Sequence, residues 1–114
     1  MKKLGLILGI LLLSTGAALA ADSAHFRGHQ IFEKWCAPCH GTGPGKPGTI
    51  ALQTKYQGKF PALLEERTDL TPDIVVYFVR HGVSIMPFFR KTDITDADLT
   101  DLAAYLANNH APSK

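Results

Sequence analysis

Hydrophobic positions recur at helical spacing in three segments of the chain, and the middle segment has the clearest ends. An apolar run at residues 74–79 follows Thr71, Pro72 and Asp73, which have the order of an N-cap, a first-turn proline and an acidic first turn. Gly82 comes shortly after this run, and glycine readily adopts the left-handed conformation that ends a helix. The pattern therefore predicts a helix from Pro72 to just before Gly82.

A second helix is predicted near the end of the chain, starting at Thr95. Thr95 and Asp98 have the spacing of a capping box. The apolar residues that follow at positions i, i+3, i+4 and i+7 are Leu99, Leu102, Ala103 and Leu106. Because these positions share one helix face, we expect that face to pack on the core.

A third helix is predicted near the start, from a cap at Asp22 or Ser23 to about Trp35. Its stripe at positions i, i+4 and i+8 consists of Gly28, Phe32 and Cys36. Glycine inside a helix costs roughly 1 kcal/mol relative to alanine. Gly28 therefore indicates that another backbone passes close by, and crossing helices are the expected reason.

The rest of the chain contains no alternating strand pattern. Residues 41–48 hold four glycines and two prolines and are expected to form an irregular loop. A shorter helix is expected from Pro61 through Arg67. The predicted fold class is therefore all-α.

The first twenty residues have the pattern of a secretory signal. Lys2 and Lys3 precede an apolar stretch at residues 4–13, and Ala18-Leu19-Ala20 places small residues at the positions that signal peptidase reads. The alternative is a transmembrane anchor, but a bilayer span needs about 20 apolar residues. We expect residues 1–20 to be a signal peptide and residues 21–114 to be one exported domain.

Composition and charge exclude some classes of function. The chain is 46% hydrophobic and 19% charged, which is typical of a globular protein rather than a disordered one. Without Lys2 and Lys3 the twelve basic residues fall to ten, which equals the ten acidic residues. A nucleic-acid binder normally has a basic excess, so that class is disfavoured. A domain this small often relies on a disulfide, metal or cofactor.

The two cysteines point to a cofactor. A disulfide between Cys36 and Cys39 would close too short a loop to stabilise a fold. His40 follows directly, and the run Cys36-Ala37-Pro38-Cys39-His40 has the C-x-x-C-H pattern of covalent haem c attachment. Each thiol would add to a haem vinyl group, and His40 would bind the iron.

Two further kinds of site use closely spaced cysteines. A thiol-disulfide oxidoreductase would place the cysteines in a βαβ context, which the pattern lacks. A zinc site would need a second pair of ligands at suitable spacing, which the chain does not offer. A chance match to the C-x-x-C-H pattern also stays open, because the pattern spans only five residues.

Met86 is the candidate for the second axial ligand. It is the only methionine outside the expected signal peptide, and Pro87 follows it in a loop. A thioether is a soft donor that suits reduced iron, and a His/Met pair raises the haem potential. A lone methionine otherwise fills gaps in a core. His81 is the competing ligand, although its place at a helix end also suits a cation that interacts with the helix dipole.

The motifs that carry a family resemblance are Gly28-x-x-x-Phe32-x-x-x-Cys36-x-x-Cys39-His40, Val79-Arg80-His81-Gly82 before Met86-Pro87-x-Phe89, and Leu102-Ala103-Ala104-Tyr105-Leu106. Together they resemble a small bacterial class I cytochrome c over essentially all of residues 21–114. The resemblance implies an all-α fold with crossing terminal helices and one haem c between His40 and Met86. It also implies that a proline carbonyl, at Pro44 or Pro47, accepts the ring N–H of His40.

A finer resemblance involves residues 55–59 and 88–91, which are similar to cytochrome subunits of flavoprotein dehydrogenases of the 4-cresol dehydrogenase type. It implies a periplasmic electron-transfer protein with no substrate chemistry of its own. Such a protein accepts electrons from a dehydrogenase that oxidises phenolic substrates and passes them to a cytochrome, cupredoxin or oxidase of the respiratory chain. A general carrier to a terminal oxidase and a partner of a quinoprotein dehydrogenase stay open as alternatives.

Overall fold

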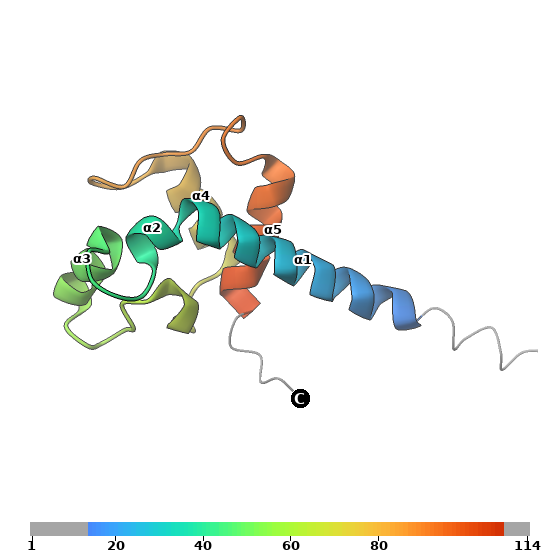
Figure 1. The fold of residues 1–114 in the computed structure, drawn as a ribbon, viewed down its shortest axis with the longest axis horizontal. Coiled ribbons are helices and arrows are strands. Elements are labelled where there is room, and N and C mark those ends of the chain that lie inside the picture. Colours follow the sequence, from blue (N-terminus) through green and yellow to red (C-terminus); the bar gives the residue numbers. More distant parts are fainter. Residues whose placement is uncertain (1–13, 109–114) are drawn as a thin grey trace, which may run out of the picture.

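The computed structural model describes residues 14–108, and the regular structure of this part is helical (Figure 1). The elements in chain order are α1 (Ser14–Trp35), α2 (Ala37–His40), α3 (Pro47–Tyr56), a 3-10 turn (Leu64–Glu66), α4 (Pro72–His81) and α5 (Asp96–Asn108). Within residues 14–108 the only β-type pairing is an isolated bridge between Val83 and Met86. The expected all-α fold is confirmed.

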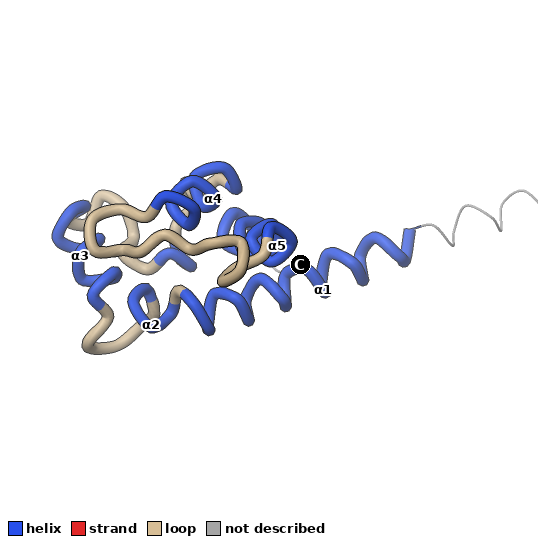
Figure 2. The backbone as a smooth tube through the Cα atoms, turned by 90° about the horizontal axis from the view of Figure 1, so that it is seen from above, coloured by secondary structure: helices blue, strands red, loops and turns tan. Residues whose placement is uncertain are grey.

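Helices α1 and α5 cross, as Figures 1 and 2 show, and their backbones approach closely at Gly28. A Cβ atom on Gly28 would overlap the carbonyl oxygen of Asp101 and would lie 2.5 Å from the Cβ of Tyr105. The two backbones can approach this closely only because residue 28 has no side chain. Beside the crossing, Phe32 and Leu102 are fully buried and begin the core. The expected close approach at Gly28 is confirmed.

We expect Gly28→Ala to lower the free energy of unfolding by about 2 kcal/mol, because the added methyl group overpacks a contact with backbone that cannot move aside. Chemical denaturation followed by circular dichroism measures this change. Gln30→Ala, at an exposed position of the same helix, is the matched control and is expected to change stability by less than about 0.5 kcal/mol. Equal denaturation midpoints for Gly28→Ala and the wild type would contradict this account of the crossing.

The predicted ends of α4 and the predicted start of α5 are also confirmed. The backbone N–H of Ile74 donates to the hydroxyl of Thr71 at 3.3 Å. The N–H of Asp98 donates to the hydroxyl of Thr95 at 3.1 Å. Gly82 ends α4 with φ +68°, in the left-handed region that favours glycine.

Two predicted boundaries need correction, and one helix of the structure, α3, was not predicted from the sequence. Helix α1 begins at Ser14 rather than at a cap near Asp22, because the alanine-rich residues in between have high helix propensity. The loop expected at residues 41–48 ends at residue 46, since Pro47 occupies the first turn of α3. Helix α3 has no buried residue and so lacked a hydrophobic pattern.

The helix expected at residues 61–67 is only the 3-10 turn Leu64–Glu66. As for the membrane, no helix among residues 14–108 combines the length and the apolar character needed to cross a bilayer.

Candidate haem site

The C-x-x-C-H segment continues directly from α1 into α2. The N–H of Cys36 donates to the carbonyl of Phe32 at 2.8 Å, and the N–H of His40 donates to the carbonyl of Cys36 at 2.7 Å. Cys36 and Cys39 therefore stand one helical turn apart, Cys36 half-buried and Cys39 exposed, and both are free thiols. The structure thus brings the two cysteines and the histidine of the motif together on one short, ordered segment.

Burial affects the chemistry of Cys36. It raises the pKa of the thiol to about 12, and the neighbouring Cys39 contributes to this rise. A thiol-disulfide oxidoreductase needs the opposite, a cysteine with a lowered pKa that is a thiolate at neutral pH. The environment of Cys36 therefore does not favour dithiol exchange.

His40 is half-buried and packs closely against the start of α3. A Cβ atom on Gly48 would lie 2.7 Å from Cε1 of the His40 ring, so the first turn of α3 packs directly against the imidazole. Burial lowers the pKa of His40 and favours the neutral imidazole, which is the form that binds metals. The Nδ1 atom is buried without a hydrogen-bond partner. The carbonyl that the resemblance implied at Pro44 or Pro47 is therefore not in hydrogen-bond contact with this ring.

Two hydrogen bonds that the sequence did not predict hold the loop at residues 41–46 against α2. The ammonium of Lys46 donates to the carbonyl of Ala37 at 3.0 Å. The hydroxyl of Thr49 donates to the carbonyl of Gly41 at 2.9 Å. These bonds connect α2 to α3 and so position Gly48 against His40.

Met86 lies at the end of a tight turn after α4. Its N–H donates to the carbonyl of Val83 at 2.9 Å, and the N–H of Val83 donates to the carbonyl of Met86 at 3.1 Å. A Cβ atom on Gly82 would lie 2.6 Å from the Met86 carbonyl oxygen, so the turn requires glycine there. The Met86 side chain is half-buried. Met86 therefore lies on an ordered turn.

The loop that carries Met86 is anchored to α4 by Arg80, a residue that sequence reasoning did not assign. Its guanidinium donates to the carbonyl of Phe89 at 3.0 Å and to the carboxylate of Asp96 at 2.8 Å. The Phe89 ring packs edge-on against Trp35 with centroids 5.7 Å apart. Phe89 therefore belongs to the packing of the loop, whereas Phe88 is 61% exposed.

His81, the competing ligand, is turned toward its own helix. Its ring stacks on Tyr77 with centroids 4.4 Å apart, and Nδ1 lies 2.8 Å from the Tyr77 carbonyl oxygen. These contacts favour the structural interpretation of His81.

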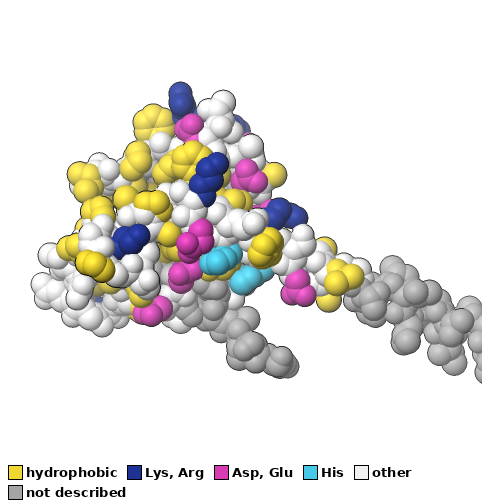
Figure 3. All heavy atoms as spheres, in the orientation of Figure 1, with side chains coloured by type: hydrophobic (Ala, Val, Ile, Leu, Met, Phe, Trp, Pro, Cys, Tyr) yellow, Lys and Arg dark blue, Asp and Glu magenta, His cyan; other side chains and the backbone are white. Residues whose placement is uncertain are grey.

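The surroundings of the motif suit an apolar group such as a porphyrin. Figure 3 shows hydrophobic side chains gathered over the half of the molecule that contains α3, α4 and the loop after α4. Large hydrophobic residues exposed in α4 and this loop are Ile74, Val76, Tyr77, Phe78, Val83, Ile85 and Phe88. An exposed apolar surface of this extent is typical of a ligand or partner site. The neutral His40 imidazole with its buried Nδ1 and the two free thiols fit haem c chemically.

The comparisons with known proteins agree with the site. The family described as Cytochrome C oxidase, cbb3-type, subunit III matches residues 24–106. Cytochrome c6 of Picosynechococcus sp. is 32% identical over 98 residues, which cover 85% of this chain and 81% of that protein. The cytochrome c subunit of 4-cresol dehydrogenase (hydroxylating) of Pseudomonas putida is 30% identical over 109 residues, covering 96% and 83%. Cytochrome c-552 of Bradyrhizobium diazoefficiens is 27% identical over 95 residues, covering 83% and 82%. No solved structure matches significantly.

The chain belongs to the cytochrome c family, as a small class I cytochrome c. Its cofactor is covalently bound haem c, and the family is one of electron carriers.

Proposed function

We propose that Cys36 and Cys39 form the two thioethers to haem and that His40 and Met86 are the axial ligands. The observation that carries this assignment is the continuous α1–α2 segment, which places both thiols one turn apart with the half-buried imidazole directly after them. The ordered turn at Met86 supports the second ligand. When bound, haem supplies reversible one-electron chemistry at its iron.

We further propose that the protein is a periplasmic electron carrier without substrate chemistry of its own. With His40 and Met86 on the iron, no coordination position is open for oxygen activation. The favoured donor is a flavoprotein dehydrogenase that oxidises phenolic substrates, because the relative from Pseudomonas putida matches 96% of the chain. The electron then passes to a cytochrome, cupredoxin or oxidase of the respiratory chain.

Stopped-flow reduction tests the donor. The purified cytochrome is mixed with a 4-cresol-reduced dehydrogenase of that type from the same source, and the rise of the reduced haem spectrum is followed. We expect fast reduction at micromolar concentrations. Reduction by a quinoprotein dehydrogenase at a higher rate would favour that alternative. The similarity to cytochromes c6 and c-552 supports the remaining alternative, a general carrier to a terminal oxidase.

We propose that residues 1–20 are a signal peptide removed after Ala20 during export. The structure describes only residues 14–20 of this segment, and the side chains at residues 16–20 are all exposed. Figure 2 shows the first turns of α1 projecting from the body of the molecule. Cleavage would therefore remove no described contact of the core.

Edman sequencing or intact mass of the protein from the periplasm is expected to show a chain that begins at Ala21 and carries one haem. An uncleaved N-terminus in the membrane fraction would contradict the proposal and favour an anchor.

Docking to the donor is expected to involve the loop that follows Met86. Phe88 offers an exposed aromatic contact, and Arg90 and Lys91 lie beside it with side chains 71% and 74% exposed. Each cation pairs with a carboxylate, Arg90 with Asp93 and Lys91 with Asp96, so charge reversal also leaves an acidic surface there. Arg90→Glu with Lys91→Glu should slow reduction by the dehydrogenase about tenfold at low ionic strength, and less at high salt.

A second charge reversal, Lys55→Glu with Lys59→Glu, changes the net charge equally in residues 55–59, the other segment that resembles the dehydrogenase cytochrome subunits. We expect the loop variant to be the slower of the two, and both variants to keep the wild-type haem spectrum. Equal rates for the loop variant and the wild type at low salt would remove Arg90 and Lys91 from the docking surface.

A further inference from the structure

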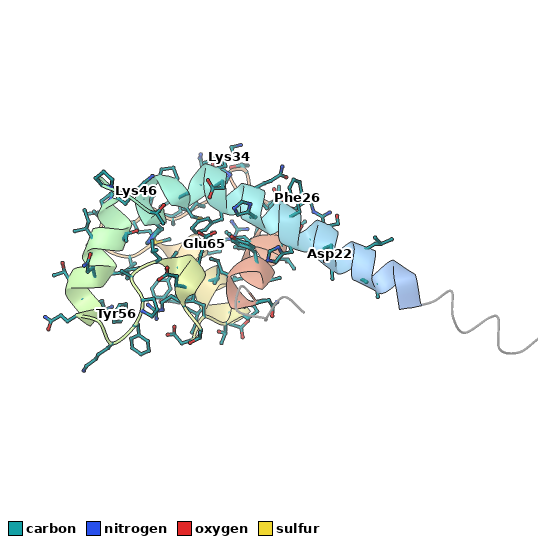
Figure 4. All side chains as sticks on the ribbon, turned by 60° about the horizontal axis from the view of Figure 1, so that its bottom comes forward. Asp22, Phe26, Lys34, Lys46, Tyr56 and Glu65 are labelled. Atoms are coloured by element: carbon teal, nitrogen blue, oxygen red, sulfur yellow. The ribbon has the colours of Figure 1, made fainter. Side chains whose placement is uncertain are left out.

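A second cluster of potential metal ligands lies on the side of α1 that faces the 3-10 turn. The ring nitrogen of His29 and the carboxylate oxygens of Glu33 and Glu65 all lie within 4.8 Å of one another. His29 Nε2 is 3.6 Å from Glu33 Oε1, with both side chains about half exposed. Figure 3 shows histidine and acidic side chains side by side in this region, and Figure 4 shows Glu65 next to α1. Among residues 14–108 this is the only such group of three.

The three side chains come from two elements, α1 and the 3-10 turn. His29 and Glu33 are one helical turn apart on α1, so they point to the same side of the helix. Glu65 comes from the 3-10 turn and accepts a hydrogen bond from the hydroxyl of Tyr105. Tyr105 is itself buried against Gly28 at the α1–α5 crossing. The crossing that organises the core thus also places Glu65 opposite His29.

Tyr105 also packs against the imidazole. The His29 ring lies 5.4 Å from the Tyr105 ring, centroid to centroid, and the His25 ring lies 4.9 Å from it on the preceding turn. A metal site usually has such an outer layer, in which hydrogen bonds and packing hold the ligands in place. Here a single buried tyrosine contacts both the histidine and one of the carboxylates.

We propose that His29, Glu33 and Glu65 bind a divalent transition-metal ion, with Zn²⁺ as the best-matched probe. One imidazole nitrogen and two carboxylate oxygens form a borderline donor set that suits zinc, which binds such atoms at about 2.0–2.2 Å. Ligand atoms around one tetrahedral ion lie roughly 3.4 Å apart by that geometry. The 3.6 Å separation of His29 and Glu33 already fits, and the ligand atoms of all three residues lie within 4.8 Å of one another, so small side-chain rotations suffice to bring them around one ion. Solvent supplies the fourth ligand.

The site is separate from the haem ligands. None of its three residues belongs to the C-x-x-C-H segment or to the Met86 loop. Metal binding would join α1 to the 3-10 turn. It would thereby link Glu33 and Glu65, which are 32 residues apart in the sequence. The simpler alternative is that the His29–Glu33 ion pair and the Tyr105–Glu65 hydrogen bond exist without any metal. Binding measurements separate the two.

The test is isothermal titration calorimetry with Zn²⁺ on the haem-loaded protein at pH 7, after treatment with a chelator. Haem attachment removes the cysteine thiols as competing zinc ligands. We expect one saturable site in the wild type. His29→Gln and Glu65→Gln are each expected to weaken zinc binding at least tenfold while leaving the haem spectrum unchanged.

The control variant is His81→Gln, which removes an exposed histidine outside the cluster and is expected to bind zinc within twofold of the wild type. Tyr105→Phe keeps the ring but removes the hydroxyl that donates to Glu65. Because Glu65 is then held less firmly, we expect zinc binding to weaken by about tenfold. Absence of saturable binding below millimolar zinc would overturn the proposal. Wild-type affinity in His29→Gln or in Glu65→Gln would also overturn it.

Discussion

Replacing both Cys36 and Cys39 with serine is expected to abolish covalent haem attachment and to prevent the chain from folding to its native helical content. Without the haem, the exposed apolar surface of α4 and its following loop has nothing to cover it. The remaining core is small for a domain of this length, because α3 contributes no buried residue to it. We therefore expect haem binding that is coupled to folding to supply much of the stability.

The measurement is haem staining of the denatured protein together with far-ultraviolet circular dichroism. Each single variant, Cys36→Ser or Cys39→Ser, keeps one thioether at most and is the matched control for the loss of one link. A double variant that shows the helical signal and thermal transition of the wild type without haem would contradict the cofactor-dependent core.

Met86→Ala is expected to keep the haem attached but to lower the reduction potential by on the order of 100 mV, within the range of about 0.8 V that axial ligands span. Water or a nitrogen ligand stabilises ferric iron better than a thioether does. The weak absorption of ferric iron bonded to methionine sulfur, near the red end of the spectrum, should disappear as well.

Potentiometric titration measures the shift, and Ile85→Ala is its matched control. Ile85 precedes the proposed ligand and is 82% exposed, so its truncation should leave both the potential and the red absorption nearly unchanged. Absence of that absorption in the wild type, together with an unchanged potential in Met86→Ala, would show that another residue is the ligand. His81 would then be tested next, although its stacking on Tyr77 would first have to be broken.

Local signals in the sequence predicted the parts of this protein that depend on neighbours along the chain. The caps at Thr71 and Thr95 form because a hydroxyl reaches an N–H three residues later, whatever the rest of the chain does. The all-α class and the haem chemistry of the C-x-x-C-H run were predicted from short patterns in the same way. Gly28 was informative about a distant contact, because its cost in a helix needs a compensating close approach.

Tertiary contacts decided the features that local patterns did not show. Helix α3 is held by its neighbours rather than by a buried face of its own, and Lys46 and Thr49 tie it to α2 through bonds that no spacing rule indicates. The placement of Arg80 between Phe89 and Asp96 likewise depends on where the chain returns after Met86.

Local patterns also could not show that Nδ1 of His40 is buried without a hydrogen-bond partner. Nor could they show that His29, Glu33 and Glu65 form a cluster. The resemblance implied a proline carbonyl for His40, but whether an acceptor reaches this atom depends on the path of the 41–46 loop. His29 and Glu33 share a helix face that the sequence shows, whereas Glu65 comes from the 3-10 turn, where it accepts a hydrogen bond from Tyr105 of α5. The sequence by itself determined the helices, their caps and the haem-binding motif, since these depend on residues a few positions apart. The three-dimensional packing alone decided which distant side chains meet.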